Sequence, residues 1–209
     1  LEFAAGKVCK VGDEISCFLK KALEAGTEGL VVKLLNSPYT PGKRGNLWLK
    51  LKPDYSDSMG DSIDVVPIGA WYGNGRKAGW FSPFLLAVYD PEMEQYQTLC
   101  RCMSGFTDEF YKEKTKFFKK NQISPQPMIV RGENPSVWFK PCEVWEIRGA
   151  ELTVSPVHKA GEGLLSHEGK GLSIRFPRFI RVRKDRDVTD TTTPDQLVDI
   201  FNSQARRLS

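Results

Sequence analysis

Residues 62–103 read SIDVVPIGAWYGNGRKAGWFSPFLLAVYDPEMEQYQTLCRCM. Three runs in this stretch are rich in apolar, β-branched and aromatic residues, as strands are. Turn-forming residues separate the runs, with Gly73-Asn74-Gly75 after the first and Asp90-Pro91 after the second. The stretch therefore predicts a mainly β unit. The three expected strands are 62–72, 84–89 and 95–103.

The C-terminal half adds strands and two helices to this unit. The further expected strands are 137–148, 151–157 and 172–183. Thr107 is a good N-cap and acidic residues follow it, so a helix is expected from there to Lys120. A last helix is expected from Thr193 to about Arg206. Five or six short strands with one inserted helix are typical of a five-stranded OB-fold barrel.

The beginning of the chain has a different pattern. Apolar residues fall at helical spacing in residues 13–25, and Gly26 ends the expected helix. Short strands are expected at 28–35 and 47–52, and alternation places the tryptophan and both lysines of the second strand on one face. A polar stretch follows, with a boundary expected at residues 55–60. The expected domains are 1–55 and 56–209.

Composition places the chain among ordinary globular proteins. Of its 209 residues 40% are hydrophobic and 27% charged, and the net charge is +4. No apolar run approaches the ~20 residues of a membrane span, so we expect no membrane partner. Five scattered cysteines without a Cys-x-x-Cys pair argue against a zinc site and for reduced thiols. The start at Leu1 lacks an initiator methionine and a signal peptide, so we expect it to lie inside a longer protein.

Two basic clusters stand out against this modest net charge. In residues 175–186, six arginines and lysines accompany one acid, Asp185. The second cluster comprises Lys43, Arg44, Lys50 and Lys52. An OB fold binds nucleic acid through basic and aromatic side chains, and Phe176 and Phe179 among the arginines fit that use. A solvated edge strand would show the same pattern, and composition alone does not decide between them.

Several aromatic residues and both histidines admit a structural interpretation. Four aromatic residues are expected in the barrel core more than as stacking platforms: Trp71, Tyr72, Trp80 and Phe81. Trp138 and Trp145 are also expected in the core. His158 and His167 lie in a glycine-rich stretch without the spacing of metal ligands, so neither is expected to have a functional role.

The two N-terminal strands carry groups suited to a phosphate ligand. Glu28 and Lys33 lie at the ends of the first strand, whereas Lys50 and Lys52 lie on the second. Paired strands would bring these groups to one surface, where the carboxylate can hold Mg²⁺ and the ammonium groups can contact phosphate. The alternative is that the lysines only solvate the wet face of an amphipathic sheet.

The order of several motifs resembles that of the ATP-dependent DNA ligases. Residues 28–33 (EGLVVK), 41–44 (PGKR) and 48–55 (WLKLKPDY) resemble motifs IV and V of that family, and residues 175–186 (RFPRFIRVRKDR) resemble motif VI. Residues 69–79 and 84–87 look like the first hairpin of the ligase OB domain, and residues 105–109 and 144–146 match in order. The resemblance covers nearly the whole chain and is strongest to the eukaryotic nuclear, replicative type.

This resemblance implies the C-terminal portion of an enzyme that seals nicks in duplex DNA during replication, repair and recombination. In the family, a lysine of a Lys-x-Asp-Gly motif takes AMP from ATP, AMP passes to the DNA 5′-phosphate, and the 3′-hydroxyl closes the nick. The first domain would be the α+β remnant of an adenylation (nucleotidyltransferase) domain, and the second an OB-fold DNA-binding domain. ATP and Mg²⁺ would be the cofactors, with nicked duplex DNA and the rest of the ligase chain as partners. The resemblance also implies a monomer in the nucleus, with a mitochondrial or plastid form as the alternative.

Roles for single residues follow from the same resemblance. The catalytic set is Lys50, Lys52, Arg183, Asp185 and Arg186. The cofactor-binding set is Glu28, Lys33, Lys50, Lys52, Arg183 and Arg186, with Glu28 as the metal ligand. The DNA-binding set is Arg175, Phe176, Arg178, Arg76 and Lys77. The lysines of motif V would contact the α-phosphate as AMP moves, and the motif VI group would orient the leaving pyrophosphate, because phosphoryl transfer rests on positioning and charge stabilisation.

One departure from the family is decisive for this chain. No Lys-x-Asp-Gly occurs in it, so the nucleophilic lysine is absent and we expect the isolated chain to form no AMP adduct. Two alternatives stay open: a non-catalytic OB module that binds nucleic acid, and an mRNA-capping guanylyltransferase of the same architecture. The motif VI cluster argues against the first, since a binding module needs no pyrophosphate clamp. The ligase-like segments 69–79 and 175–186 argue against the second.

Overall fold

The computed structural model of this chain describes residues 4–39, 41–42, 45–52, 62–124 and 130–207. The chain divides into two compact units between Ser56 and Asp57. The boundary expected at residues 55–60 and the basic residues Lys43 and Arg44 lie outside the described residues. Among the described helices, none has the length and apolar character to cross a membrane.

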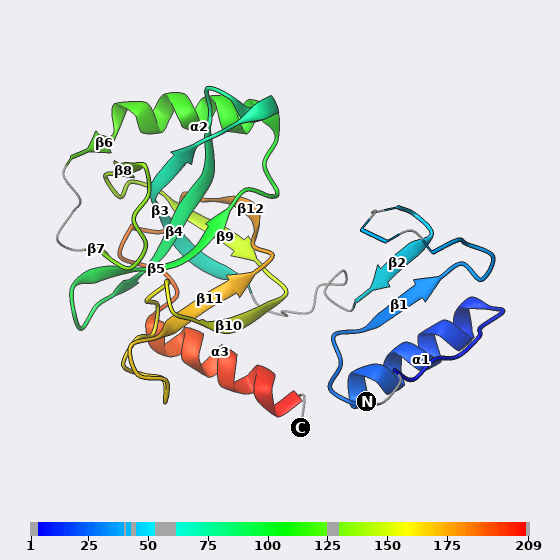
Figure 1. Ribbon diagram of the computed structural model, residues 1–209. Coiled ribbons are helices and arrows are strands. Elements are labelled where there is room, and N and C mark those ends of the chain that lie inside the picture. Colours follow the sequence, from blue (N-terminus) through cyan, green and yellow to red (C-terminus); the bar gives the residue numbers. More distant parts are fainter. Residues whose placement is uncertain (1–3, 40, 43–44, 53–61, 125–129, 208–209) are drawn as a thin grey trace. The chain divides into compact units, whose positions relative to one another are not determined.

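The first unit consists of one helix and a two-stranded ribbon (Figure 1). Its elements are α1 (Gly12–Glu24), β1 (Leu30–Lys33) and β2 (Trp48–Leu51). The strands are antiparallel, and Gly29 enters β1 at φ +138°, where an added Cβ would collide with the carbonyl oxygen of Leu51. The expected helix and both strands are therefore confirmed, with shorter strands. None of the described residues of this unit is buried.

The second unit is a β-barrel with two helices. Its strands are β3 (Ile63–Tyr72), β4 (Phe81–Asp90), β5 (Gln95–Cys102), β6 (Gln122–Ile123), β7 (Val130–Arg131), β8 (Val137–Phe139), β9 (Val144–Arg148), β10 (Glu151–Ser155), β11 (Gly171–Arg175) and β12 (Arg178–Arg183). Five of them run in the order β12-β9-β3-β4-β5. A parallel bridge between Ser104, just after β5, and Arg178 closes this sheet on itself. The expected five-stranded barrel is therefore confirmed.

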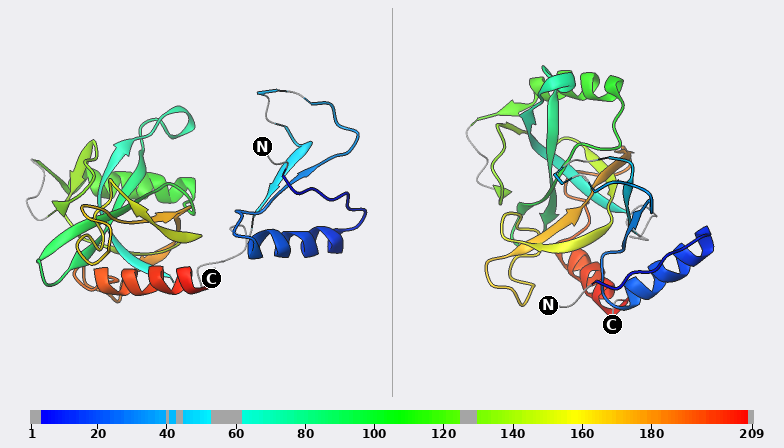
Figure 2. Two further views of the ribbon diagram at one scale, coloured as in Figure 1. Left: turned by 60° about the horizontal axis from the view of Figure 1, so that its bottom comes forward. Right: turned by 45° about the vertical axis from the view of Figure 1, so that its right-hand side comes forward.

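Two helices lie on opposite sides of the barrel (Figure 2). They are α2 (Asp108–Lys120) and α3 (Pro194–Arg207). The Thr107 hydroxyl accepts a hydrogen bond from the Phe110 N–H at 3.2 Å, which is the cap expected from the sequence. Both expected helices are confirmed.

Prolines interrupt two of the expected long strands. Residues 137–148 split into β8 and β9 around Pro141, and residues 172–183 split into β11 and β12 at Phe176-Pro177. Proline cannot donate to a strand ladder, and Phe176 adopts a left-handed φ of +52°. The strands β6 and β7 were not expected from the sequence, because two residues are too few to show a period.

Aromatic side chains fill the barrel. Trp145 is fully buried and contacts Phe84, Phe106 and Phe179 at centroid distances of 5.1, 5.5 and 5.2 Å. The core assignments of Trp145 and Phe81 are confirmed. Four other expected core residues lie further out, because they stand near strand ends and turns: Tyr72 is exposed, and Trp71, Trp80 and Trp138 are partly buried.

Candidate nucleotide and DNA interface

The ribbon of the first unit brings motif IV and motif V together. Glu28 precedes β1, Lys52 follows β2, and the Lys52 ammonium donates a hydrogen bond to the Glu28 carboxylate in an ion pair. The Lys52 side chain is 19% exposed, whereas the Glu28 side chain is 71% exposed. Of the three lysines expected to share a surface with Glu28, Lys52 is the one that pairs with it.

The other two ribbon lysines, Lys33 and Lys50, lie on one face of the ribbon. The register pairs Val31 with Lys50 and Lys33 with Trp48, so these side chains lie on one face. The Lys33 ammonium lies 4.2 Å from the centroid of the Trp48 ring, a cation–π contact. Lys50 is exposed. This face therefore presents the ammonium groups of Lys33 and Lys50 to solvent, with that of Lys33 held by the Trp48 indole, while the Lys52 ammonium is engaged by Glu28.

The expected Mg²⁺ site finds few ligands here. The described residues contain no group of three or more histidine, cysteine, aspartate or glutamate side chains that could hold a metal ion. Glu28 alone of the assigned residues offers a carboxylate at the ribbon, and Lys52 already pairs with it. Magnesium needs one or two free carboxylates together with phosphate oxygens or waters. The described residues therefore do not fit a metal cage, and no chemical step is assigned to Mg²⁺ here.

In the second unit, Arg183 of motif VI is clamped between two carboxylates. Its Nη1 donates to both oxygens of Asp64, at 3.1 and 2.9 Å. Its Nε and Nη2 donate to the two oxygens of Asp185, at 3.0 and 2.7 Å. Arg186 joins the cluster, with Nε 3.4 Å from Asp64 and Nη1 2.6 Å from Asp190. The structure thus brings the three assigned motif VI residues together around one further acid.

The electrostatics of this cluster follow from burial and charge. Hydrogen bonds from Arg183 hold the pKa of the Asp185 carboxyl well below its usual range. Burial raises the pKa of Asp64, because desolvation outweighs the attraction of Arg183 and Arg186. The two carboxylates therefore hold the same arginine in different surroundings, one exposed and one largely enclosed.

Asp64 and Asp190 were not assigned from the sequence. Asp64 could have been noticed, because it is the one charged residue in the otherwise apolar run 63–68, and a buried carboxylate needs a cationic partner. Asp190 could not have been noticed in this way, because the residues around it in the sequence are polar. Both line an open cleft of about 630 Å³ beside motif VI. The other residues that line it are Ser62, Arg183, Arg186, Thr191, Thr192, Thr193, Gln196, Asp199 and Ile200.

The assigned DNA-binding residues after β11 differ sharply in exposure. Phe176 is 61% exposed and is held at φ +52°, a conformation that bulky residues rarely adopt. Arg175 pairs with Glu151 at 2.6 Å, and its guanidinium lies 5.1 Å from the Phe176 ring centroid. Arg178 is exposed, whereas Phe179 is 8% exposed and belongs to the core. Of the two phenylalanines that fitted nucleic-acid binding by composition, Phe179 therefore belongs to the barrel, and Phe176 presents its ring to solvent.

Arg76 and Lys77, on the 3₁₀ turn η2 (Gly75–Lys77), are both tied to α2. The Arg76 side chain is 82% exposed and pairs with Asp108 at 2.6 Å. The Lys77 ammonium donates to the Tyr111 hydroxyl at 2.8 Å and to the Met103 carbonyl at 3.3 Å. Arg76 remains accessible to a ligand, while Lys77 fixes the turn against the helix.

Comparison with known proteins places this geometry in a family. The family model described as "ATP dependent DNA ligase C terminal region" matches residues 77–186, and that described as "ATP dependent DNA ligase domain" matches residues 1–52. The chain is 49% identical over 199 residues to DNA ligase 6 of Arabidopsis thaliana, covering 93% of this chain and 14% of that protein. It is 50% identical over 200 residues to DNA ligase 3 of Schizosaccharomyces pombe, covering 90% of this chain and 26% of that protein. With the DNA ligase of Sulfolobus acidocaldarius it shares 41% identity over 198 residues, covering 93% of this chain and 33% of that protein.

The chain therefore spans between about a seventh and a third of the length of these relatives. Their sources include a plant, a fission yeast and an archaeon, so the match does not single out the eukaryotic nuclear type. The match over residues 1–52 contains the ribbon with motif IV and the strand of motif V, and the match over residues 77–186 contains the barrel strands β4 to β12 with motif VI. On these grounds the chain belongs to the ATP-dependent DNA ligases.

Proposed function

We propose that the protein containing this chain seals single-strand nicks in duplex DNA through enzyme-AMP and DNA-adenylate intermediates. In this proposal the chain supplies the phosphate-contacting lysines and the pyrophosphate clamp, while the nucleophilic lysine comes from sequence outside it. The observation that supports this division is the arginine clamp on the barrel. Arg183 has five N–H donors in a planar fork, and such a fork matches the oxygens of a phosphate as well as those of a carboxylate.

The clamp suggests how this chain acts during self-adenylation. When a lysine attacks the α-phosphorus of ATP, pyrophosphate leaves with negative charge on its oxygens. Arg183 and Arg186 would stabilise that charge once pyrophosphate replaces Asp64 or Asp185 as the acceptor. Lys50 on the ribbon would stay with the α-phosphate as AMP moves to the DNA.

The barrel would contribute a second function after the nucleotide has reacted. The exposed ring of Phe176 suits an apolar wedge in the minor groove beside the nick, and Arg178 suits a contact to backbone phosphate. We also propose that the protein is a ligase of the nuclear, replicative type and acts as a monomer. It would use a divalent cation bound mainly by residues outside this chain. The resemblance of the motifs supports this assignment, and imaging of the tagged full-length protein in cells tests its location.

The test uses the intact ligase and separates the two chemical steps. Lys50→Ala should slow transfer of AMP to nicked DNA by about 10²–10³ while changing DNA binding much less. Arg183→Ala should impair self-adenylation and spare sealing of a nick that already carries 5′-AMP. Equal failure of the Arg183 variant on the pre-adenylated nick would refute the pyrophosphate role. An AMP adduct on the isolated chain, seen with labelled ATP after denaturing electrophoresis, would refute the absence of a nucleophile.

A further inference from the structure

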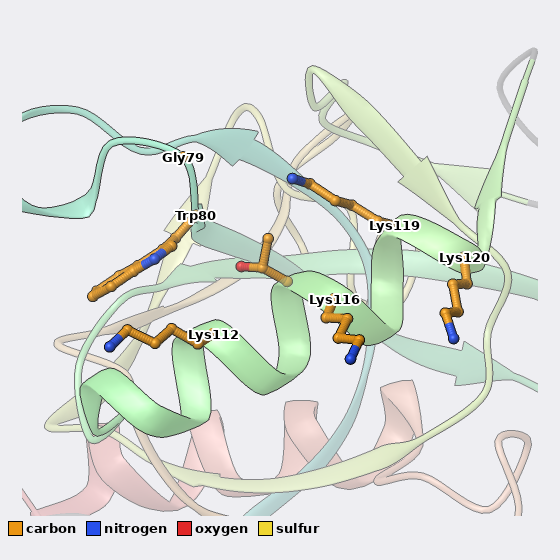
Figure 3. A pocket seen from close by; sticks show the side chains of 7 residues that line it. Gly79, Trp80, Lys112, Lys116, Lys119 and Lys120 are labelled. Carbon is orange, nitrogen blue, oxygen red and sulfur yellow. The ribbon is translucent and has the colours of Figure 1, made fainter.

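A groove outside the motif VI cleft lies between α2 and the turn before β4 (Figure 3). Its volume is about 430 Å³. The residues that line it are Gly79, Trp80, Lys112, Thr115, Lys116, Lys119 and Lys120. Lys112 lies beside the Trp80 ring at one end of the groove, and Lys120 lies at the other. Four lysines and no carboxylate therefore line this surface.

The sequence of α2 sets the four lysines on one side of a rigid helix. Lys112, Lys116, Lys119 and Lys120 recur at helical spacing. The other side of the helix is packed, with Tyr111 and Phe118 buried, and Thr115 lies buried at the floor of the groove. The Thr115 hydroxyl accepts a hydrogen bond from the Phe81 N–H at 3.0 Å, which joins the helix to β4. The groove is thus preformed by the fold.

The charge in the groove is not compensated within the described part of the chain. Lys114 on the same helix is buried and pairs with Glu143 at 2.6 Å, whereas none of the four groove lysines has an ion pair with a described residue. Like charges four residues apart on a helix destabilise it, and Lys112 and Lys116, like Lys116 and Lys120, stand in that relation. The helix dipole favours cations only in the last turn. It therefore accounts for Lys119 and Lys120. Asp108 and Glu113 stand four and three residues before Lys112 and Lys116, but Asp108 pairs with Arg76 and Glu113 with Lys114, so the charges of Lys112 and Lys116 stay available to an anionic ligand.

The side chain of Trp80 borders the groove at one end. The Trp80 ring is stacked on Tyr111, with centroids 5.8 Å apart and planes at 16°, and the Lys112 ammonium lies 5.7 Å from its centroid. The ring is therefore a wall of the groove and not a platform for a base.

The spacing of the lysines suits a row of phosphates. Eight residues of helix separate the first and last lysine, about 12 Å at 1.5 Å per residue. One DNA strand carries a phosphate about every 3.4 Å along the axis, so the lysines span about three or four phosphates.

We propose that this groove binds the phosphodiester backbone of duplex DNA, as a contact additional to those of Arg175, Phe176 and Arg178. The inference rests on the proposed function in one respect, that duplex DNA is the substrate. Continuity of the surface supports it, because Arg76 lies in the same turn as Gly79 and pairs with Asp108 at the start of α2. The segment before α2 also meets the Arg178 region through the Ser104–Arg178 bridge.

The experiment removes the four charges and compares two sets of lysines. In the 209-residue chain, Lys112, Lys116, Lys119 and Lys120 are replaced by Gln, which keeps a high helix propensity. The control variant replaces the exposed lysines Lys10, Lys20, Lys21 and Lys170 by Gln and has the same net charge. Binding to a nicked duplex is measured by fluorescence anisotropy between about 50 and 200 mM salt. In the groove variant, the slope of log K against log salt should become shallower by about 3. In the control variant, the slope should stay close to that of the unchanged chain.

A second measurement locates the contact on the protein. Acetylation of lysines, read by mass spectrometry, should show the four groove lysines protected by duplex DNA. Protection by a poly-glutamate peptide without protection by DNA would overturn the proposal in favour of an acidic protein partner. An unchanged salt slope and unprotected lysines would also overturn it, and would leave the proposed ligase function intact. Conversely, the intact protein could fail to seal nicks while loss of the four lysines still weakens its binding to duplex DNA. That result would refute the proposed ligase function and leave the proposed DNA contact in place.

Discussion

Asp64 and Arg183 lie 119 positions apart in the sequence and form a doubly hydrogen-bonded ion pair in the barrel, with Nη1 at 3.1 and 2.9 Å from the two carboxylate oxygens. Asp185 occupies the other edge of the same guanidinium. A phosphate that binds both edges of the Arg183 fork must therefore displace a carboxylate, and the burial of Asp64 makes it the stronger structural anchor. The pair joins β3 to the end of β12, so it serves the barrel as well as the motif.

Replacing the buried acid should destabilise the barrel. Asp64→Asn removes the charge opposite Arg183 and Arg186, and we expect the free energy of unfolding to fall by about 1–3 kcal/mol. Asp190→Asn removes an exposed partner of Arg186 and should change it by less than about 1 kcal/mol. Urea denaturation followed by circular dichroism measures both. If the two variants lost the same stability, the Arg183–Asp64 pair would be no more than a surface ion pair.

Phe176 and Phe179 should respond oppositely to truncation. Phe179 is packed between Phe106 and Trp145, so Phe179→Ala should reduce stability by about 3–5 kcal/mol. Phe176 is exposed and strained at φ +52°, so Phe176→Gly should raise stability by about 1 kcal/mol. Phe176→Ala should weaken binding to a nicked duplex without changing the salt slope, because no phosphate contact is lost.

Melting temperatures and nicked-duplex titrations of the three variants decide the assignment. A large fall in melting temperature with Phe176→Ala would place that ring in the core and refute the wedge. Arg178→Ala serves as the comparison for binding, since loss of one phosphate contact should lower the salt slope by about 1.

How far the sequence predicts this structure depends on the length of each signal. The helices at α2 and α3 and the long strands β3, β4 and β5 are predictable, because caps and apolar runs span many residues. The breaks at Pro141 and Pro177 were missed because apolar residues continue on both sides of each proline. Motif VI was found from its letters, but Asp64 was not assigned, since its partner lies in a strand distant in sequence. The lysines of α2 could not be assigned to a ligand from the sequence, because a helix with many lysines most often has a solvated face.

Burial of His158 should make the stability of the barrel depend on pH. Burial lowers the pKa of His158 below its ordinary value; Arg101 also lowers it, while Glu133, 3.8 Å away, raises it without prevailing. As the pH falls, the His158 imidazole therefore takes up a proton in the unfolded chain before it does so in the folded chain. This group's contribution to the free energy of unfolding is therefore fully present above the ordinary histidine pKa of about 6.5, and it is lost as the pH falls below that value.

His158→Asn should flatten this dependence. One proton can contribute a slope of at most about 1.4 kcal/mol per pH unit, and the variant should lose that part of the slope between about pH 6.5 and 5. His167→Asn is the matched control, because His167 is exposed in the same loop region. Urea midpoints measured across this range test the expectation. Identical slopes for the wild type and the His158 variant would contradict it.

The two units should differ in protection from hydrogen exchange. None of the described residues of the first unit is buried, and its ribbon has only four paired residues on each strand. A two-stranded ribbon with one helix buries too little apolar surface to be stable alone. The barrel, by contrast, has a closed sheet around a fully buried tryptophan.

Amide exchange followed by mass spectrometry should therefore show weak protection across residues 4–52 and strong protection in β3, β4, β5 and β9. Because local opening and not global unfolding controls exchange in the first unit, Asp64→Asn should speed exchange in the barrel strands and leave residues 4–52 unchanged. Equal protection in the two units, or a parallel response of both to Asp64→Asn, would show that they form one cooperative core.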